Sequence, residues 1–231
     1  MDKKVVIVAI DGPAGAGKST VAKKLAKKLG FLHIDTGAMY RAVTLAALRQ
    51  KADLKDDGVL EKIARESKIE LKPGEPENRI FLNGGDVSKE IRTPEVTQAS
   101  SFIANCVPVR KILVGRQQQM GREDSKPYGG AVLEGRDIGT DVFPDAQYKF
   151  FLDASAEIRA QRRLIELQNA GNPTTLEKVL EDVVARDKRD TDRAVGGLRK
   201  TAETIVMDHS NLSVEESADA LFQYIKNNPR A

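Results

Sequence analysis

The chain has 231 residues and a formal net charge of +3, with 40% hydrophobic and 31% charged residues. These values exclude wholesale disorder and allow one well-cored domain with a small inserted lobe. Apolar runs of about six residues are too short to span a bilayer, and the single cysteine, Cys106, cannot form an internal disulfide, so we expect a cytoplasmic protein that does not bind membranes.

Short apolar stretches alternate with helical patterns along most of the chain. The expected strands lie near 4–10, 32–35, 131–134, 148–152 and 203–207. The expected helices lie near 18–29, 38–50, 95–121, 155–169, 175–192 and 213–227. Five apolar strands joined by helical crossovers predict an α/β fold of the P-loop NTPase kind, with a five-stranded parallel sheet flanked by helices.

The first strand and helix enclose a phosphate-binding motif. The segment reads Gly12-Pro13-Ala14-Gly15-Ala16-Gly17-Lys18-Ser19-Thr20, which matches G-x-x-x-x-G-K-[ST] between a strand and a helix. Its glycines let backbone N–H groups approach phosphate oxygens, and the helix N-terminus favours the same anion. We predict that Lys18 reaches the β- and γ-phosphates of ATP and that the Ser19 hydroxyl binds Mg²⁺.

Polar residues follow the second strand, in the order Asp35-Thr36-Gly37-Ala38-Met39-Tyr40-Arg41. The carboxyl end of a strand in such a sheet borders the ligand crevice, so Asp35 and Thr36 are expected to face the phosphate loop. A helix N-cap is the alternative role for either residue, and it is compatible with ligand contact. Arg41 is expected on the first turn of the next helix.

A segment near 68–92 departs from the alternation of strands and helices. It contains Ile69-Glu70-Leu71, Pro73-Gly74-Glu75-Pro76, Arg79-Ile80-Phe81-Leu82 and Asn83-Gly84-Gly85-Asp86. This pattern predicts short antiparallel strands joined by turns. With a helix on each side, the segment is expected to be a small β insert in a single principal domain spanning 1–231.

The third strand of the sheet is followed by Glu134-Gly135-Arg136-Asp137. Glu134 is predicted to hold a Mg²⁺-bound water, and Arg136 to clamp a phosphate with two parallel hydrogen bonds. The structural alternative is an ion pair between Arg136 and Asp137. It is less favoured because Gly135 has no side chain and allows another backbone to approach closely, as at a ligand site.

Arginines concentrate on the two later helices. Helix 155–169 carries Arg159, Arg162 and Arg163, and helix 175–192 with its end carries Arg186, Arg189, Asp190 and Arg193. Spacings of three and four place the second set on one stripe of the helix. Such a stripe is either a solvated face or a polyanion site, and the phosphate loop favours the polyanion.

Taken together, these motifs resemble those of bacterial cytidylate kinases over nearly the whole chain. The matching segments are GPAGAGKST, DTGAMYR, the lobe ending in GGDVSKEIRTPEV, EGRDIGT with FPDA, and RDKRDTDRAV. The resemblance implies a monomeric P-loop nucleoside monophosphate kinase that uses ATP and Mg²⁺ to phosphorylate CMP and dCMP. Region 38–121, including the insert at 68–92, would bind the acceptor, and 155–172 would form a short lid over ATP.

The resemblance also implies roles for individual side chains. Arg41 and Arg136 would hold the phosphate of CMP. The ribose would be bound by Thr36, Asp137 and Arg186, and the cytosine by Ser101, Arg110, Asp190 and Arg193, with Tyr40 also in the acceptor site. Arg159 and Arg163 would bind ATP, while Lys18, Arg136 and Arg189 would be catalytic, and Ser19 and Glu134 would serve the metal. Some family members have Ser in place of Thr36 and Asp in place of Glu134, which keeps the same functional groups.

The expected mechanism follows from charge. The phosphate of CMP has a second pKa of roughly 6, so at neutral pH its oxygen is already largely an ionised nucleophile that needs no strong general base. The site must instead align two mutually repelling polyphosphates and neutralise the charge on the transferred group. Lid closure would exclude water and prevent hydrolysis of ATP.

Three other classes fit the sequence less well. A hydroxyl-directed kinase of the shikimate kinase kind would use Asp35 as proton acceptor, whereas Gly37 with Tyr40 and Arg41 suits a phosphate acceptor. A GTP-gated switch would need Asn-Lys-x-Asp, which the chain lacks. A nucleic-acid-binding module is disfavoured because the 37 basic and 34 acidic residues interleave and aromatic residues make up only 5%. The loop 207–210 is the expected place for adenine.

Overall fold

The computed structural model describes residues 5–72, 74, 78–169 and 171–230. Within it the chain forms two compact units, one from Met1–His33 with Asp124–Ala231 and the other from Ile34–Glu123. The second unit spans nearly the same residues as the predicted acceptor region 38–121.

The large sheet confirms the predicted α/β fold with five parallel strands. Its order is β2-β6-β1-β7-β8. The strands are β1 (Val6–Asp11), β2 (Leu32–Asp35), β6 (Gly130–Gly135), β7 (Tyr148–Asp153) and β8 (Ile205–Asp208). Asp11 lies in register with Gly135 of β6 and Phe151 of β7, so these three strands end at the same edge of the sheet. The predicted first residue of the first strand, Lys4, lies outside the described residues.

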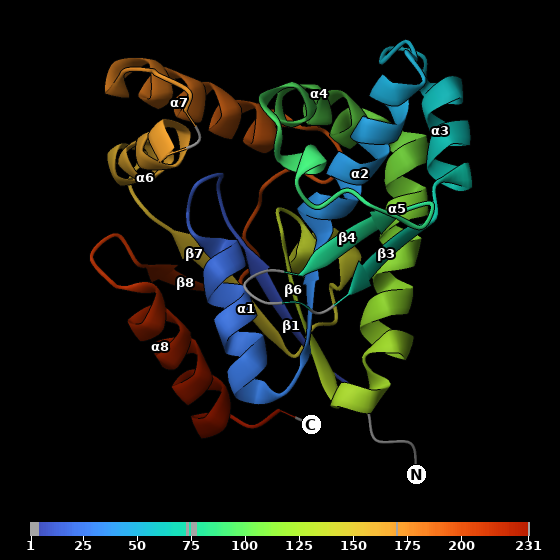
Figure 1. The fold of residues 1–231 in the computed structure, drawn as a ribbon. Helices are drawn as coiled ribbons and strands as arrows, with labels where there is room; N and C mark the ends of the chain where they lie inside the picture. The colour runs from blue at the N-terminus through green and yellow to red at the C-terminus, as the bar shows by residue number, and fades with distance from the viewer. Residues whose placement is uncertain (1–4, 73, 75–77, 170, 231) are drawn as a thin grey trace. The chain divides into compact units, whose positions relative to one another are not determined.

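Two helices cover one face of this sheet. They are α1 (Lys18–Leu29) and α8 (Val214–Asn227), which lie side by side in Figure 1. Their apolar faces pack on the strands through one buried cluster that includes Ile10, Leu25, Phe150 and Leu221. The helix ends follow the sequence signals, since Gly30 takes a left-handed conformation after α1 and the capping box of Ser213 and Glu216 begins α8.

Two more helices pack against each other, α6 (Ala156–Asn169), which lies in the segment 155–172 predicted as a lid, and α7 (Leu176–Asp192). Figure 1 draws them as an orange pair. Their shared apolar cluster contains Ala160, Val179 and Val183. Partly buried residues such as Leu164 and Leu180 pack against this cluster.

The second unit is helical, with a small sheet. Its helices are α2 (Thr36–Arg49), α3 (Asp57–Glu66), α4 (Pro94–Asn105) and α5 (Val107–Gln119). Its antiparallel sheet is β3 (Ile69–Lys72), β4 (Arg79–Leu82) and β5 (Gly85–Asp86), as the insert pattern predicted. Residues 73, 75 and 76 of the predicted turn lie outside the described residues. A core that includes Met39, Leu60, Ile80 and Leu113 holds the unit together.

Two helices differ from the expectation. The single helix predicted over 95–121 is wrong, because the chain breaks at Cys106 into α4 and α5. Pro108 lies on the first turn of α5, where its missing N–H costs nothing, whereas in the middle of a longer helix it would remove a hydrogen bond and clash with the preceding turn. Helix α3 was not among the expected elements, although Asp56 caps it by accepting from the amides of Gly58 and Val59.

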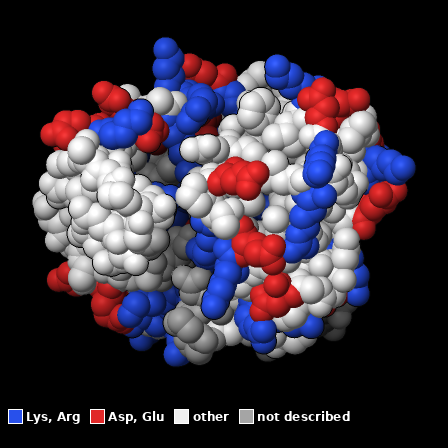
Figure 2. All heavy atoms as spheres, turned by 45° about the horizontal axis from the view of Figure 1, so that its top comes forward, with Lys and Arg blue, Asp and Glu red and all other residues white. Residues whose placement is uncertain are grey.

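Four short helical turns complete the structure. They are η1 (Glu90–Arg92), η2 (Met120–Asp124), η3 (Lys126–Tyr128) and η4 (Ile138–Val142). On the face drawn in Figure 2, acidic and basic side chains are interspersed rather than segregated. Among the described residues, none of the helices combines the length and the apolar character needed to cross a membrane.

Candidate active site

The phosphate loop has the strand-to-helix setting that its motif requires. It begins after Asp11 at the end of β1 and leads into Lys18, the first residue of α1. Gly12 has φ 152°, and a side-chain carbon there would lie 2.1 Å from the carbonyl oxygen of Leu152. Gly17, the N-cap of α1, has φ 73°. Glycine is therefore needed at both positions, where the backbone takes conformations that side chains disfavour.

Lys18 is folded over this loop. Its side chain is nearly buried, and Nζ donates a hydrogen bond to the carbonyl oxygen of Pro13 at 2.7 Å. Burial, followed by repulsion from Arg136, lowers the pKa of Lys18 to about 7. A bound polyphosphate would favour the ammonium form and raise this pKa again. A bound polyphosphate is therefore expected to determine the protonation state of Lys18.

This arrangement predicts that ATP binding takes up a proton. The free protein holds Lys18 largely neutral above its pKa of about 7, and the complex keeps it charged. Near pH 8.5, calorimetry in buffers of different ionisation enthalpy should record uptake of about one proton for each ATP bound. The affinity for ATP should fall as the pH rises through this window.

The controls for proton uptake are two methionine variants. Lys18→Met should abolish the uptake, whereas Lys24→Met should keep it, because Lys24 is an exposed residue of α1 that pairs with Glu215. Equal proton uptake by the wild type and Lys18→Met would contradict the role of Lys18.

Ser19, Glu134 and His33 form the polar cluster at the predicted metal position. The Ser19 hydroxyl donates to Glu134 Oε2 at 2.7 Å, and His33 Nε2 lies 3.3 Å from Oε1. A hydroxyl beside a buried carboxylate fits Mg²⁺, which takes hard oxygen ligands and completes its shell with waters and substrate phosphates. In the described part of the chain no group of three or more His, Cys, Asp and Glu residues gathers as a protein-only metal site.

Asp190 lies between two arginines. Arg136 Nε donates to Asp190 Oδ2 at 2.8 Å, and Arg193 Nη2 donates to Oδ1 at 2.9 Å. Burial raises the pKa of this carboxyl, but the attraction of Arg136, Arg186 and Arg193 outweighs burial and holds the pKa below its ordinary value. Arg189 on the same stripe is exposed while Asp190 is buried, so the stripe is not a uniformly solvated face.

The start of α2 carries the predicted residues of the second strand's end. Asp35 caps the helix by accepting from the Ala38 amide at 2.8 Å, and it also accepts from Arg41 Nη2 at 3.1 Å. Arg41 lies on the second turn rather than the expected first, because the helix begins already at Thr36. A side-chain carbon on Gly37 would come within 3.1 Å of Arg41 Nη1, so glycine leaves room for the guanidinium.

Two other predicted acceptor residues of this unit lie together. The Arg110 guanidinium stacks over the Tyr40 ring at 5.7 Å from its centroid, and its Nη1 donates to the carbonyl of Ala104 at 3.4 Å. Ser101 is on α4, and its hydroxyl donates to the Gln98 carbonyl of the same helix at 3.1 Å.

The arginines of α6 have different surroundings. Arg159 is buried, donates from Nη1 to the Ala14 carbonyl of the phosphate loop at 3.2 Å, and pairs with Asp187 at 2.7 Å. Arg163 instead pairs with Glu166 on its own helix. Arg159 therefore stabilises the phosphate loop by a hydrogen bond to the loop's backbone.

The sequence predicted Arg162 and His209 only as members of larger sets, the arginines of helix 155–169 and the adenine loop 207–210. Arg162 Nη2 donates to the carbonyls of His209 and Ser210 at 3.2 and 3.4 Å, and its buried Nη1 has no hydrogen-bond partner among the described residues. His209 is buried, and its Cε1 would stand 3.3 Å from a side-chain carbon on Gly17. Burial chiefly lowers the pKa of His209. The signal for His209 was its position just after the last strand.

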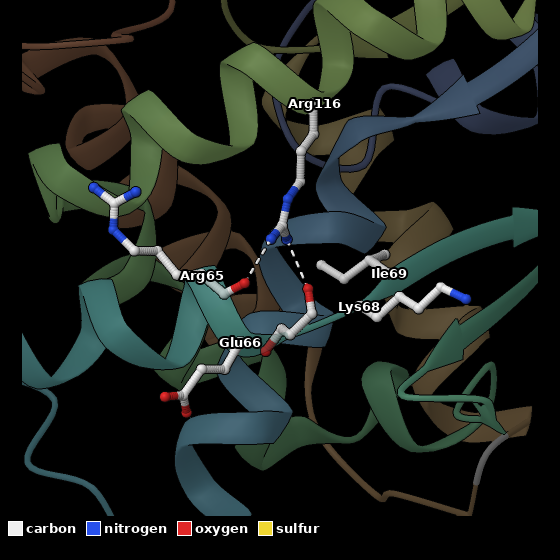
Figure 3. A pocket seen from close by; sticks show the side chains of 6 residues that line it. Arg65, Glu66, Lys68, Ile69 and Arg116 are labelled. Atoms are coloured by element: carbon white, nitrogen blue, oxygen red, sulfur yellow. Dashed lines mark hydrogen bonds between the residues drawn. The ribbon is translucent and has the colours of Figure 1, made fainter.

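A separate cavity of about 290 Å³ lies in the second unit. Its lining consists of Arg65, Glu66, Ser67, Lys68, Ile69 and Arg116. Figure 3 shows Arg116 reaching two backbone oxygens at the end of α3, the carbonyls of Ser67 at 2.8 Å and Arg65 at 3.1 Å. The cavity contains none of the predicted site residues, and Arg116 satisfies carbonyls that the helix end leaves open.

A phosphate loop between the first strand and helix of a parallel sheet defines the P-loop class of nucleotide-binding proteins. The profile of the cytidylate kinase family matches residues 8–227. The chain is 47% identical to a cytidylate kinase of Bacillus cereus over 97% of each chain, and 49% identical to one of Bacillus thuringiensis over 94% of this chain and 93% of that one. The chain therefore belongs to the cytidylate kinase family.

Among solved structures the likeness concerns the fold alone. An uncharacterized protein from Eubacterium ventriosum has a TM-score of 0.51 with 13% identity, over 96% of this chain and 99% of its own. A protein from Thermus thermophilus has a TM-score of 0.50 with 17% identity, over 99% of this chain and 100% of its own.

Proposed function

We propose that this chain phosphorylates CMP and dCMP with ATP and Mg²⁺, the reaction of the family to which it belongs, through the side chains described above. The observation that carries the assignment of the site is Asp190, a buried carboxylate kept ionised between Arg136 and Arg193. An ionised acceptor suits the exocyclic amine of cytosine, and the adjacent Arg136 suits a phosphate.

The donor half of the site is built on the phosphate loop. Residues 12–20 bind the phosphates of ATP through backbone amides and Lys18. The Ser19 hydroxyl would bind Mg²⁺ and Glu134 would hold a water bound to it, and the metal would supply positive charge to neutralise the donor phosphates. Arg159 and Arg163 belong to the proposed lid at 155–172. Arg159 would act by holding the backbone of the phosphate loop, to which it donates a hydrogen bond. We include Arg162 among the residues that bind ATP, because its buried Nη1 has no protein partner among the described residues.

The acceptor half is assigned from the roles that the family resemblance implies. Arg41 and Arg136 bind the phosphate of CMP. The remaining contacts are Thr36, Asp137 and Arg186 to the ribose, and Ser101, Arg110, Asp190 and Arg193 to the cytosine, with Tyr40 supporting Arg110. Single hydrogen bonds to the base decide between CMP and UMP, because uracil has a carbonyl acceptor in place of the exocyclic amine of cytosine and an N3–H donor in place of its N3 acceptor.

The transfer step needs alignment and charge neutralisation. The acceptor phosphate is already ionised at neutral pH, since its second pKa is about 6, so no residue must remove a proton. Lys18 follows the charge that develops on the transferred group, and Arg136 holds the attacking oxygen in line. The exposed Arg189 is proposed to reach the transferred group when the lid closes and excludes water.

We further propose that the enzyme acts as a monomer in the cytoplasm. The lone Cys106 is buried and free, which suits a reducing compartment.

One assay tests the function. ATP and Mg²⁺ are mixed with CMP, dCMP, UMP, AMP, shikimate or buffer alone, and ADP is followed. We expect rapid turnover with CMP and dCMP, slower turnover with UMP, and near-background rates with AMP, shikimate and buffer; EDTA should abolish turnover. Equal rates with AMP and CMP would contradict the cytosine assignment while leaving the kinase assignment in place.

A further inference from the structure

Asp11 is a buried carboxylate to which the proposed function gives no role. It is the last residue of β1 and only 4% exposed. Both of its oxygens accept hydrogen bonds from backbone amides of a distant segment, Oδ1 from Ile138 at 2.9 Å and Oδ2 from Gly139 at 2.8 Å. A carboxylate is stable inside a protein only where such donors replace water.

These two amides begin the short helical turn η4. The residue at the turn's own N-cap position, Asp137, makes no side-chain capping bond. The first amides of a helical turn have no partner within the turn, so Asp11 supplies the cap from 127 positions earlier in the chain. A side-chain carbon on Gly139 would stand 3.2 Å from Lys149 Cγ and 3.5 Å from Asp11 Oδ2, so glycine allows this close approach.

We propose that Asp11 is a positioning residue for the acceptor nucleotide. The segment that it anchors follows directly from Arg136 and Asp137, the proposed contacts to the phosphate and ribose of CMP. The residue after Asp11 is Gly12, the first of the phosphate loop. The Asp11 carboxylate thereby fixes the position of the acceptor-binding segment relative to the phosphate loop. The inference rests on the proposed function.

The role requires the ionised form of Asp11. The charged groups around it are Lys18 from α1, Asp137 before η4 and Lys149 from β7, which pairs with Glu203. Burial raises the pKa of Asp11 to about 7, against the opposing effect of the two amides. A protonated carboxyl presents a hydroxyl donor to one of the amides and loses that bond. CMP binding should therefore weaken as the pH falls through 7.

The first test is Asp11→Asn. The amide oxygen can accept from one of the two backbone N–H groups, while the NH₂ group faces the other. We expect the KM for CMP to rise about 10-fold, the size of one lost charge-assisted bond, with the KM for ATP within about twofold of wild type. The matched control is Asp141→Asn on the same turn, a residue that pairs with the exposed Arg199 and should leave both KM values unchanged. If the role of Asp11 were only structural, Asp11→Asn would lower the melting temperature and the fraction of active enzyme but would leave both KM values unchanged.

The second test uses the wild type and stands even where the variant does not fold. At saturating ATP, the KM for CMP should be about fourfold higher at pH 6.5 than at pH 8.5, as a group with a pKa of about 7 predicts. Ionisation of the CMP phosphate, with a pKa of about 6, accounts for only about 1.3-fold of this change. An unchanged KM in folded Asp11→Asn, or a flat wild-type profile, overturns the inference. Failure of the proposed function is distinct, because the wild type would then not phosphorylate CMP at all.

Discussion

Replacing Lys18 by alanine should lower kcat by at least about 10²-fold, by analogy with the loss of other preorganised donors to a transition state. Lys18 Nζ lies 2.7 Å from the Pro13 carbonyl of the phosphate loop, where we propose that the donor phosphates bind. It is the loop's only side-chain cation. Steady-state kinetics with saturating ATP and CMP measures the effect.

Two further measurements separate catalysis from folding in Lys18→Ala. Burial disfavours the charged form of Lys18. Replacing Lys18 by alanine removes this unfavourable buried group, so the melting temperature should not fall. CMP affinity measured without ATP should change little. Lys24→Ala on the exposed side of α1 is the matched control and should keep the wild-type kcat. A Lys18→Ala variant with more than half of the wild-type kcat would rule out the proposed role.

The parts of the structure that could be predicted are those that local sequence determines. Each of the five strands of the sheet is a short apolar run, and the phosphate loop is defined by glycines, a lysine and a serine that ligand chemistry requires at fixed spacing. The break between α4 and α5 is also local, but Pro108 lies within a pattern that continues on both sides, so the helical periodicity concealed it.

The unpredicted parts depend on contacts between distant residues. Arg159, Arg162 and Arg163 look equivalent in the sequence of one helix. In the folded chain Arg159 donates to the phosphate loop, Arg162 has a buried nitrogen with no partner among the described residues, and Arg163 forms an ion pair within its own helix. In the same way, a lone aspartate before the phosphate loop carries no sequence signal for the amides of Ile138 and Gly139. Burial and long-range pairing decide such roles, and neither can be read from spacing.

Asp190 of α7 is the residue on which the preference for cytosine should depend. Its carboxylate can accept from the exocyclic amine of cytosine, which uracil replaces by a carbonyl acceptor, so an ionised Asp190 attracts one base and repels the other. Arg136 and Arg193 hold its two oxygens and keep it ionised. In Asp190→Asn the amide can rotate to donate or accept, and it no longer repels uracil.

We expect Asp190→Asn to reduce the preference for CMP over UMP in kcat/KM by about 10- to 100-fold, since a charge-assisted hydrogen bond contributes roughly 1.5–3 kcal/mol. The loss should fall chiefly on CMP, because Arg136 also loses its carboxylate partner, and the KM for ATP should stay nearly unchanged. Asp192→Asn, an exposed aspartate at the end of the same helix, is the matched control and should keep the wild-type preference. Measuring kcat/KM for both acceptors decides the matter: a preference in Asp190→Asn equal to that of the control would remove Asp190 from the base-reading site and leave its two ion pairs as a purely structural contact.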